Sequence, residues 1–189
     1  INATGGAGTA GVNEGFSAFG GSIISATNAG SITINALGGT GTNNNYGVVL
    51  ASNTQITTQD GPLVISGEAN SATTADFNLG VAMWSAEVRS TGSGTILIDG
   101  KGGAGAGGFQ RGVHISGGLV TSSSTGHITI EGEGGSGDSQ NLGVVIFDSA
   151  DITSTSNALG AATITIRGTG GSGGAGDTNH HGIYFTGAG

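Results

Sequence analysis

The side chains that could do chemistry in this sequence are twelve carboxylates and four histidines, and they are scattered along the chain. Cleavage of a glycosidic bond needs two carboxyl groups that face each other, or several acids that hold Ca²⁺ beside a basic side chain. The densest acidic patch combines Asp99, Glu131 and Glu133 with Lys101 and Arg167. Because this patch matches such a site in composition only, we expect a protein that is not an enzyme.

The histidines do not form a metal-binding pattern. His114 and His127 fall in different segments, and the adjacent His180 and His181 have no partner at ligand spacing. Residues 134–138 resemble one half of a Gly/Asp-rich calcium-binding nonapeptide, but the tandem repeat of that motif is missing. We therefore expect no cofactor, with calcium as a minor alternative.

Composition excludes several classes of protein. Lys and Arg number 4 against 12 acids, and the formal charge is −8, which argues against a nucleic-acid partner. No apolar run reaches the roughly 18 residues of a spanning helix, so membrane insertion is not expected. The chain has 0 cysteines, which removes disulfide frameworks and thiolate zinc sites.

Three short strands in each repeat are expected to position these side chains. An apolar triplet begins at residues 32, 63, 96, 128 and 164, so successive copies start 31 to 36 positions apart. Each triplet precedes a glycine-rich stretch, and a second apolar strand then follows a glycine at residues 15, 47, 80, 112, 143 and 182. The third strand is marked by Ile24, Ile56, Val88, Val120 and Ile152.

Stacking of the repeats would give each of these strands a partner. Each strand alternates with a period of two, so its first and third side chains face the same way. In parallel register, about 4.8 Å apart, Ile32, Leu63 and Ile96 form one internal column. The expected fold is an all-β, right-handed parallel β-helix (a β-solenoid) with three short strands and about 33 residues per rung, over five to six rungs.

The whole chain, residues 1–189, is expected to be a single solenoid segment. It starts inside a first strand and stops after a second strand, so we expect no cap at either end. An uncapped solenoid end is an open sheet edge, on which another rung can stack. We therefore expect a segment of a longer repeat protein, with an end-to-end fibre of copies as the alternative.

The 42 glycines also need a physical cause, because glycine loses more conformational entropy on folding than any other residue. The glycine-rich stretches at 38–41, 102–105, 134–137 and 170–174 fall between strands. There we expect positive φ angles and close backbone approach. A flexible linker or a sandwich of polyproline-type helices is the alternative, but apolar triplets at fixed phase favour the solenoid.

Two outward columns are expected to carry charge. In the predicted register Lys101 lies between Glu68 and Glu133, and Arg167 lies beside Glu131. Opposite charges on adjacent strands contribute roughly 0.2–1 kcal/mol each. The alternative is that these side chains are simply solvated.

Aromatic side chains recur just after the second strand. Phe19, Trp84 and Phe147 occupy one outward column, and Tyr184 lies in the column beside it. We expect this stripe to pack against a neighbouring rod or to stack on sugar rings. The alternative is that the aromatics fold over the corner of the rung and shield the core.

The repeated unit resembles a known type of surface protein. Residues 126–132 read Gly, one residue, Ile-Thr-Ile, one residue, Gly, and they are followed by a Gly-Gly-x-Gly loop and by Gly-Val-x-Ile. This pattern, which covers essentially the whole chain, looks like the filamentous-haemagglutinin type of giant bacterial surface protein. The resemblance implies an extracellular β-helical shaft at the bacterial cell surface, used in adhesion, sheath or biofilm construction, without catalytic residues.

We therefore expect a structural shaft or fibre subunit that acts through rigidity and lateral contacts. Its expected partners are other copies of itself or other rungs, and surface glycans. A carbohydrate-binding or carbohydrate-cleaving β-helix is the main alternative. Ice binding is a third, suggested by the hydroxyl file Ser25, Thr57, Thr121 and Thr153, which Arg89 interrupts.

Overall fold

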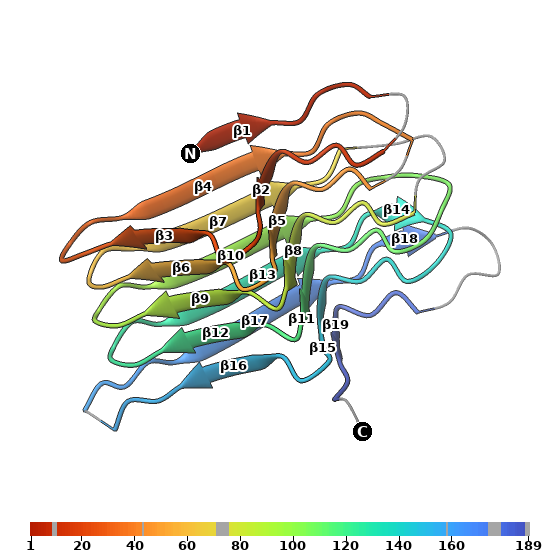
Figure 1. The fold of residues 1–189 in the computed structure, drawn as a ribbon. Coiled ribbons are helices and arrows are strands. Elements are labelled where there is room, and N and C mark those ends of the chain that lie inside the picture. The colour runs from red at the N-terminus through yellow and green to blue at the C-terminus, as the bar shows by residue number, and fades with distance from the viewer. Residues whose placement is uncertain (9–10, 43, 71–75, 158, 174–178, 188–189) are drawn as a thin grey trace.

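The computed structural model describes residues 1–8, 11–42, 44–70, 76–157, 159–173 and 179–187, which form strands and loops (Figure 1). The chain winds as a right-handed parallel β-solenoid, so the expected fold is confirmed. Three sheets run along the axis of the solenoid, and each complete turn contributes one strand to each of them.

The strands fall into three long sheets and one short pair. The first sheet contains β1 (Asn2–Thr4), β4 (Ile32–Leu37), β7 (Leu63–Glu68), β10 (Ile96–Lys101), β13 (Ile128–Glu133) and β17 (Ile164–Thr169). The second sheet contains β2 (Phe16–Ala18), β5 (Val48–Ala51), β8 (Val81–Trp84), β11 (Val113–Ser116), β15 (Val144–Phe147) and β19 (Ile183–Phe185). The third sheet contains β3 (Ile23–Ala26), β6 (Gln55–Thr58), β9 (Glu87–Ser90), β12 (Leu119–Ser122) and β16 (Asp151–Ser154). The short pair is β14 (Ser136–Gly137) with β18 (Ser172–Gly173).

Every pairing is parallel and places equivalent residues of successive turns opposite each other. Ile32 pairs with Leu63, which in turn pairs with Ile96, as the triplet spacing predicts. The same register continues through Ile128 to Ile164. A slip of one residue would turn each inward apolar side chain outward, so the burial pattern fixes this register.

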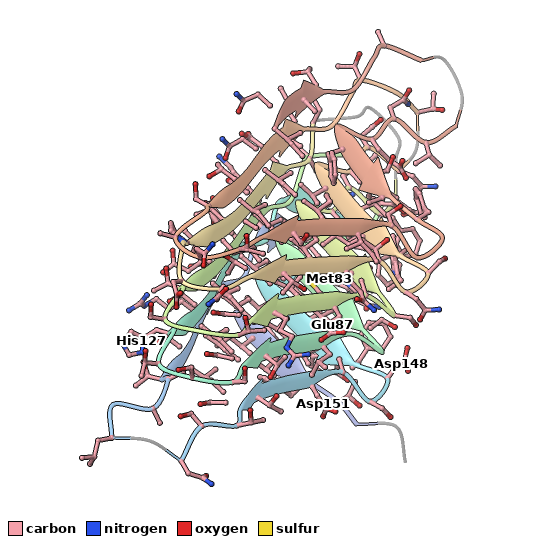
Figure 2. The ribbon with its side chains drawn as sticks, turned by 60° about the vertical axis from the view of Figure 1, so that its left-hand side comes forward. Met83, Glu87, His127, Asp148 and Asp151 are labelled. Carbon is pink, nitrogen blue, oxygen red and sulfur yellow. The ribbon has the colours of Figure 1, made fainter. Side chains whose placement is uncertain are left out.

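The apolar core lies between the three sheets and runs along the axis. Ile34 from the first sheet, Leu50 from the second and Ile56 from the third are all fully buried in it. Met83 also lies in this core, whereas Asp148 and Asp151 lie on the exposed outside near the corner between the second and third sheets (Figure 2). No single strand could bury these side chains, so the core depends on stacking of the turns.

The chain that leaves the first sheet and the chain that enters the second sheet cross at glycines. A Cβ at Gly100, near the end of β10, would collide with the carbonyl oxygen of Gly112, which precedes β11. One turn later, a Cβ at Gly132 would collide in the same way with the carbonyl oxygen of Gly143. These crossings explain why a glycine ends the triplet motif and another precedes the second strand.

Beyond each crossing the chain runs outward and returns, and we call these loops the glycine arms (described parts of 5–14, 38–46, 69–79, 102–111, 134–142 and 170–181). Successive outgoing halves pair with each other, since Ser136 N–H donates to Gly103 C=O (3.1 Å). Outgoing and returning halves also pair, since Gly135 N–H donates to Gln110 C=O (2.8 Å). A Cβ at Gly135 would collide with the carbonyl oxygen of Gly103. The arms therefore form a stacked layer of their own, held together by backbone contacts.

The glycines of the arms act mainly through close backbone approach. Among the described glycines, positive φ is found only at Gly11, Gly20, Gly21, Gly117 and Gly160. The expectation of positive φ at the described glycines of 38–41, 102–105, 134–137 and 170–173 is therefore wrong, while the expected close approach is present. The reason is that the two halves of each arm pack backbone against backbone, which leaves no room for a side chain.

Candidate functional sites

A groove runs along the outside of the first sheet, where the sheet meets the glycine arms. Its volume is about 520 Å³, and its lining includes Glu68, Lys101, Glu133 and Thr169 together with arm glycines. In the register of the sheet Lys101 lies opposite both Glu68 and Glu133. The predicted charge column of Glu68, Lys101 and Glu133 therefore forms one wall of the groove.

The charged columns make one close ion pair. Arg167 Nη1 lies 2.7 Å from Glu131 Oε1, and both side chains are partly exposed. Among the described residues, Lys101 has no carboxylate within 4.0 Å, although Glu68 and Glu133 lie on the strands beside it. Exposed pairs of this kind contribute about 0–1 kcal/mol, so these columns modulate stability rather than determine it.

Asp99 lies on β10 beside the groove, and the pKa of its carboxyl is shifted. Partial burial raises the pKa of its carboxyl, and the neighbouring Glu131 and Glu133 raise it further. A hydrogen bond from Ser66 acts in the opposite direction. No group of three or more His, Asp or Glu side chains that could hold a metal ion exists in the described part of the chain. The groove lining, which includes Glu68, Lys101 and Glu133, can offer hydrogen bonds and charge to a ligand.

The outward face of the second sheet is covered over its inner turns. Val49 and Ala82, in the outward column, are fully buried because Tyr46 and Leu79 pack against them. This second, smaller core lies outside the sheet, and Trp84 borders it. The inner turns therefore do not carry the exposed apolar stripe that strand alternation predicts.

The four aromatic residues predicted for contact have different environments. Phe19 is 47% exposed and Tyr184 42% exposed, and they lie on the two outermost turns. Trp84 and Phe147 are half-buried. Both contact His114 edge to face, with ring centroids 5.7 Å and 4.9 Å from it. These two aromatics belong to a side-chain cluster that the sequence did not reveal.

His114 is the centre of that cluster. Its Nδ1 lies 2.8 Å from Arg111 Nη1, and its Nε2 lies 3.3 Å from Trp84 Nε1. Arg111 Nη2 donates to Gln140 Oε1 (3.0 Å), and the guanidinium lies 5.0 Å from the ring centre of Phe109. Arg111 and His114 are 7% and 5% exposed, respectively. A basic pair is thus buried between the second sheet and the glycine arms.

Burial dominates the electrostatics of this region. It lowers the pKa of His114 to about 3, with a further contribution from the charge of Arg111. It also lowers the pKa of Arg111 to about 10, and it raises the pKa of Tyr46 to about 12, helped by Glu14. At neutral pH the imidazole is therefore uncharged and Arg111 carries the only charge of the pair.

The returning halves of the arms adopt an unusual backbone conformation. Asn44, Phe77, Phe109, Gln140 and Asn179 occupy equivalent positions, and each has a positive φ between 53° and 73°. Bulky side chains rarely adopt this conformation. The rings of Phe77 and Phe109 stack with centroids 4.5 Å apart, so ring stacking offsets the strain at these two positions.

A buried amide ladder fills the interior of the arms. Asn45 Nδ2 donates to Asn78 Oδ1 (3.3 Å), and Asn78 Nδ2 donates to Gln110 Oε1 (2.7 Å). The backbone N–H of Gln110 donates in turn to Asn141 Oδ1 (3.2 Å). All four residues are fully buried. Amides suit this position because each can donate to one turn and accept from another.

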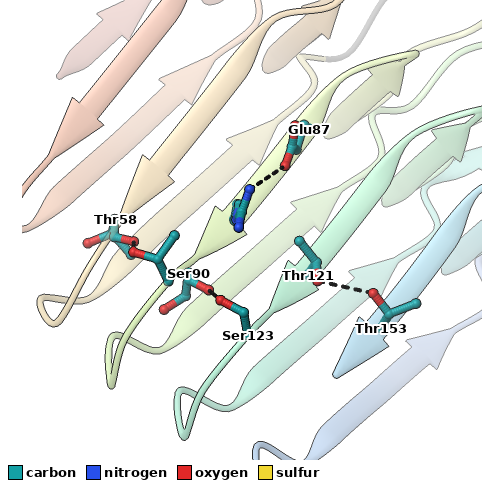
Figure 3. A network of polar contacts seen from close by, with 8 residues as sticks. Thr58, Glu87, Ser90, Thr121, Ser123 and Thr153 are labelled. Carbon is teal, nitrogen blue, oxygen red and sulfur yellow. Dashed lines mark hydrogen bonds and ion pairs between the residues drawn. The ribbon is translucent and has the colours of Figure 1, made fainter. Parts of the chain in front are cut away.

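The hydroxyl file of the third sheet forms few cross-turn contacts. Thr153 Oγ1 donates to Thr121 Oγ1 (3.1 Å), and Arg89 lies 3.8 Å from Glu87 on its own strand (Figure 3). Ser123 Oγ instead donates to the carbonyl oxygen of Ser90 in the adjacent turn (3.3 Å). The Thr153 and Ser123 contacts connect neighbouring turns, which is a structural role for these hydroxyls.

No family model, curated protein or solved structure matches the chain. A helix long and apolar enough to cross a membrane is not found in the described residues. The solenoid shape alone does not identify the filamentous-haemagglutinin family, so that resemblance stays a prediction.

Proposed function

We propose that this chain is a structural shaft or fibre segment of a bacterial surface or extracellular filament. The observation that carries the proposal is unbroken parallel pairing of the first sheet, from β1 through β17, around one continuous apolar core. Pulling along the axis of such a stack loads many backbone hydrogen bonds at once. Rigidity along the axis is the property on which this proposal rests.

Electron microscopy of the native filament or sheath material tests this role. We expect rods whose axial repeat is about 4.8 Å, the spacing of stacked strands. Immunogold labelling of intact cells should place the chain on the outside. Compact particles, or a signal only inside permeabilised cells, would contradict the proposal.

Lateral contact between shafts is proposed to use the stripe formed by Phe19, Trp84, Phe147 and Tyr184. Aromatic side chains are enriched at protein contact surfaces; in this stripe Phe19 and Tyr184 are exposed, and Trp84 and Phe147 are half-buried. A Trp84→Ser, Phe147→Ser double variant should bundle less than the wild type in sedimentation experiments, after circular dichroism has shown that its sheets are intact. Leu97→Ser, on the outward face of the first sheet, is the matched control. Equal loss of bundling in both variants would remove the stripe from the proposal.

Carbohydrate binding is the second candidate, and the groove beside the glycine arms favours it. Its carboxylates and backbone edges can hydrogen-bond to sugar hydroxyls. Titration calorimetry with neutral and basic polysaccharides should detect binding that a Glu68→Gln, Glu133→Gln double variant weakens about tenfold. Absence of heat with every polysaccharide, at concentrations up to the millimolar range, would reject this candidate.

A further inference from the structure

Both ring nitrogens of His114 face hydrogen-bond donors. Arg111 Nη1 lies 2.8 Å from Nδ1, and Trp84 Nε1 lies 3.3 Å from Nε2. Guanidinium and indole N–H groups can donate but cannot accept. A neutral imidazole accepts through one nitrogen, so the shorter contact assigns Nδ1 as the acceptor. A second proton would therefore go to Nδ1, where the guanidinium of Arg111 cannot accept a hydrogen bond from it.

Among the residues that the structure describes, none packed around His114 supplies a compensating negative charge. The glycine arm before its own strand contributes Arg111, β8 contributes Trp84 and β15 contributes Phe147. The loop before β15 contributes the neutral amide of Gln140, and Tyr184 on β19 interacts with Arg111. Within the described residues Arg111 forms no ion pair. An imidazolium here would lie against a guanidinium in a site that is 5% exposed.

We propose that Arg111, His114 and Trp84 form an acid-sensitive latch: a proton on His114 releases Arg111 and the Gln140 loop from the outer face of the second sheet and exposes Trp84. The proton comes from solvent and adds to the imidazole, and no covalent bond is broken. The inner core, whose described members are all apolar, stays folded. The latch does not depend on the shaft role proposed above.

The direction of the pH dependence follows from linkage. The pKa of His114 is about 3 when the cluster is closed, and its ordinary value is 6.5. The folded-state pKa is lowered, so the closed cluster is fully stable above pH 6.5 and loses stability as the pH falls toward 3. In that window the open form binds one more proton than the closed form. The ratio of open to closed molecules therefore rises about tenfold for each pH unit.

The single tryptophan of the chain reports directly on the latch. Fluorescence emission and acrylamide quenching of Trp84 are followed between pH 7 and pH 2.5, with far-UV circular dichroism as the measure of sheet content. His114→Val takes the residue that the next turn has at this position, Val145. His114→Gln keeps an acceptor for Arg111 without a titrating group and serves if the valine variant does not fold. His127→Gln, at an exposed histidine, is the control.

We expect a red shift and stronger quenching of Trp84 in the wild type and in His127→Gln as the pH falls, with the sheet signal retained. In the His114 variants these changes should be absent. Identical titrations of the wild type and the His114 variants would overturn the latch, because carboxylates would then be responsible. Simultaneous loss of the sheet signal in the wild type would also overturn it, because the opening would then be global.

Discussion

The inner core and the glycine arms reach the same depth of burial by different chemistry. Ile98 and Ile130, between the sheets, are fully buried, and so are Asn78 and Asn141 within the arms. The core packs apolar side chains into one another, whereas the arms pack backbone against backbone around an amide ladder. Parallel stacking makes both arrangements workable, because each turn satisfies the polar groups of the next. Removal of side-chain atoms should therefore destabilise the core, and addition of side-chain atoms should destabilise the arms.

Removal of atoms from the core should have the largest effect. Ile98→Ala deletes part of a side chain that is 0% exposed, and it should destabilise the protein by about 2–5 kcal/mol. Urea unfolding followed by circular dichroism measures the change. Ile23→Ala, at a residue that is 70% exposed, is the control and should be nearly neutral. Equal losses in the two variants would mean that the core is not where the structure places it.

Addition of one methyl group to the arms should come next. Gly135→Ala places a Cβ against the carbonyl oxygen of Gly103, and overpacking of this kind costs about 1–3 kcal/mol or more. Gly6→Ala has nothing within 4 Å of its added Cβ and is the matched control. If the free energies of unfolding of both variants match the wild type, the backbone packing of the arms is refuted.

Interruption of the amide ladder should have a somewhat smaller effect. Asn78→Leu keeps the approximate volume but removes the partner of Asn45 and Gln110, which costs about 1–3 kcal/mol. Asn35→Leu changes an exposed asparagine of the first sheet and should cost little. Amide hydrogen exchange should show the loss concentrated in the arms. Exchange that increases equally in the core would contradict separate layers.

The smallest expected effect is a gain in stability on the first sheet beside the groove. Asp99→Asn removes a carboxylate whose pKa is raised by burial and by Glu131, so it should stabilise the protein by about 0.2–1 kcal/mol at pH 7. The raised pKa means that the fold favours the neutral acid. The gain should therefore shrink as the pH falls through the raised pKa of the folded state, and it should be lost below 3.8, where Asp99 is protonated in both states. A gain that is the same at pH 7 and pH 3 would rule out this electrostatic origin.

The inner core could be predicted from the sequence because it depends on strand alternation alone. The triplets fix which residues point inward, and the repeat spacing then fixes their partners, such as Ile32 with Leu63. The partners of Lys101 and Arg167 followed from the same register. These inferences needed no knowledge of the loops.

The arms could not be predicted in the same way, because their contacts depend on loop geometry. Coverage of Val49 and Ala82 requires the returning halves to fold over the second sheet, and strand periodicity carries no information about that. His114 meets Arg111 only because the chain turns at Gly112 between them. A signal did exist in the recurring amide two residues before the second-strand glycine, at Asn45, Asn78, Gln110 and Asn141.

The most direct test of parallel in-register stacking is a distance along the first sheet. Asn35 and Arg167 occupy one outward column and are four strands apart, through Ser66, Asp99 and Glu131. Spin labels on cysteines introduced at these two positions, in a chain with 0 native cysteines, can be measured by pulsed electron resonance. Stacked turns predict a narrow distribution near roughly 19 Å, four strand spacings of about 4.8 Å. A broad distribution, or one centred beyond about 30 Å, would contradict the solenoid.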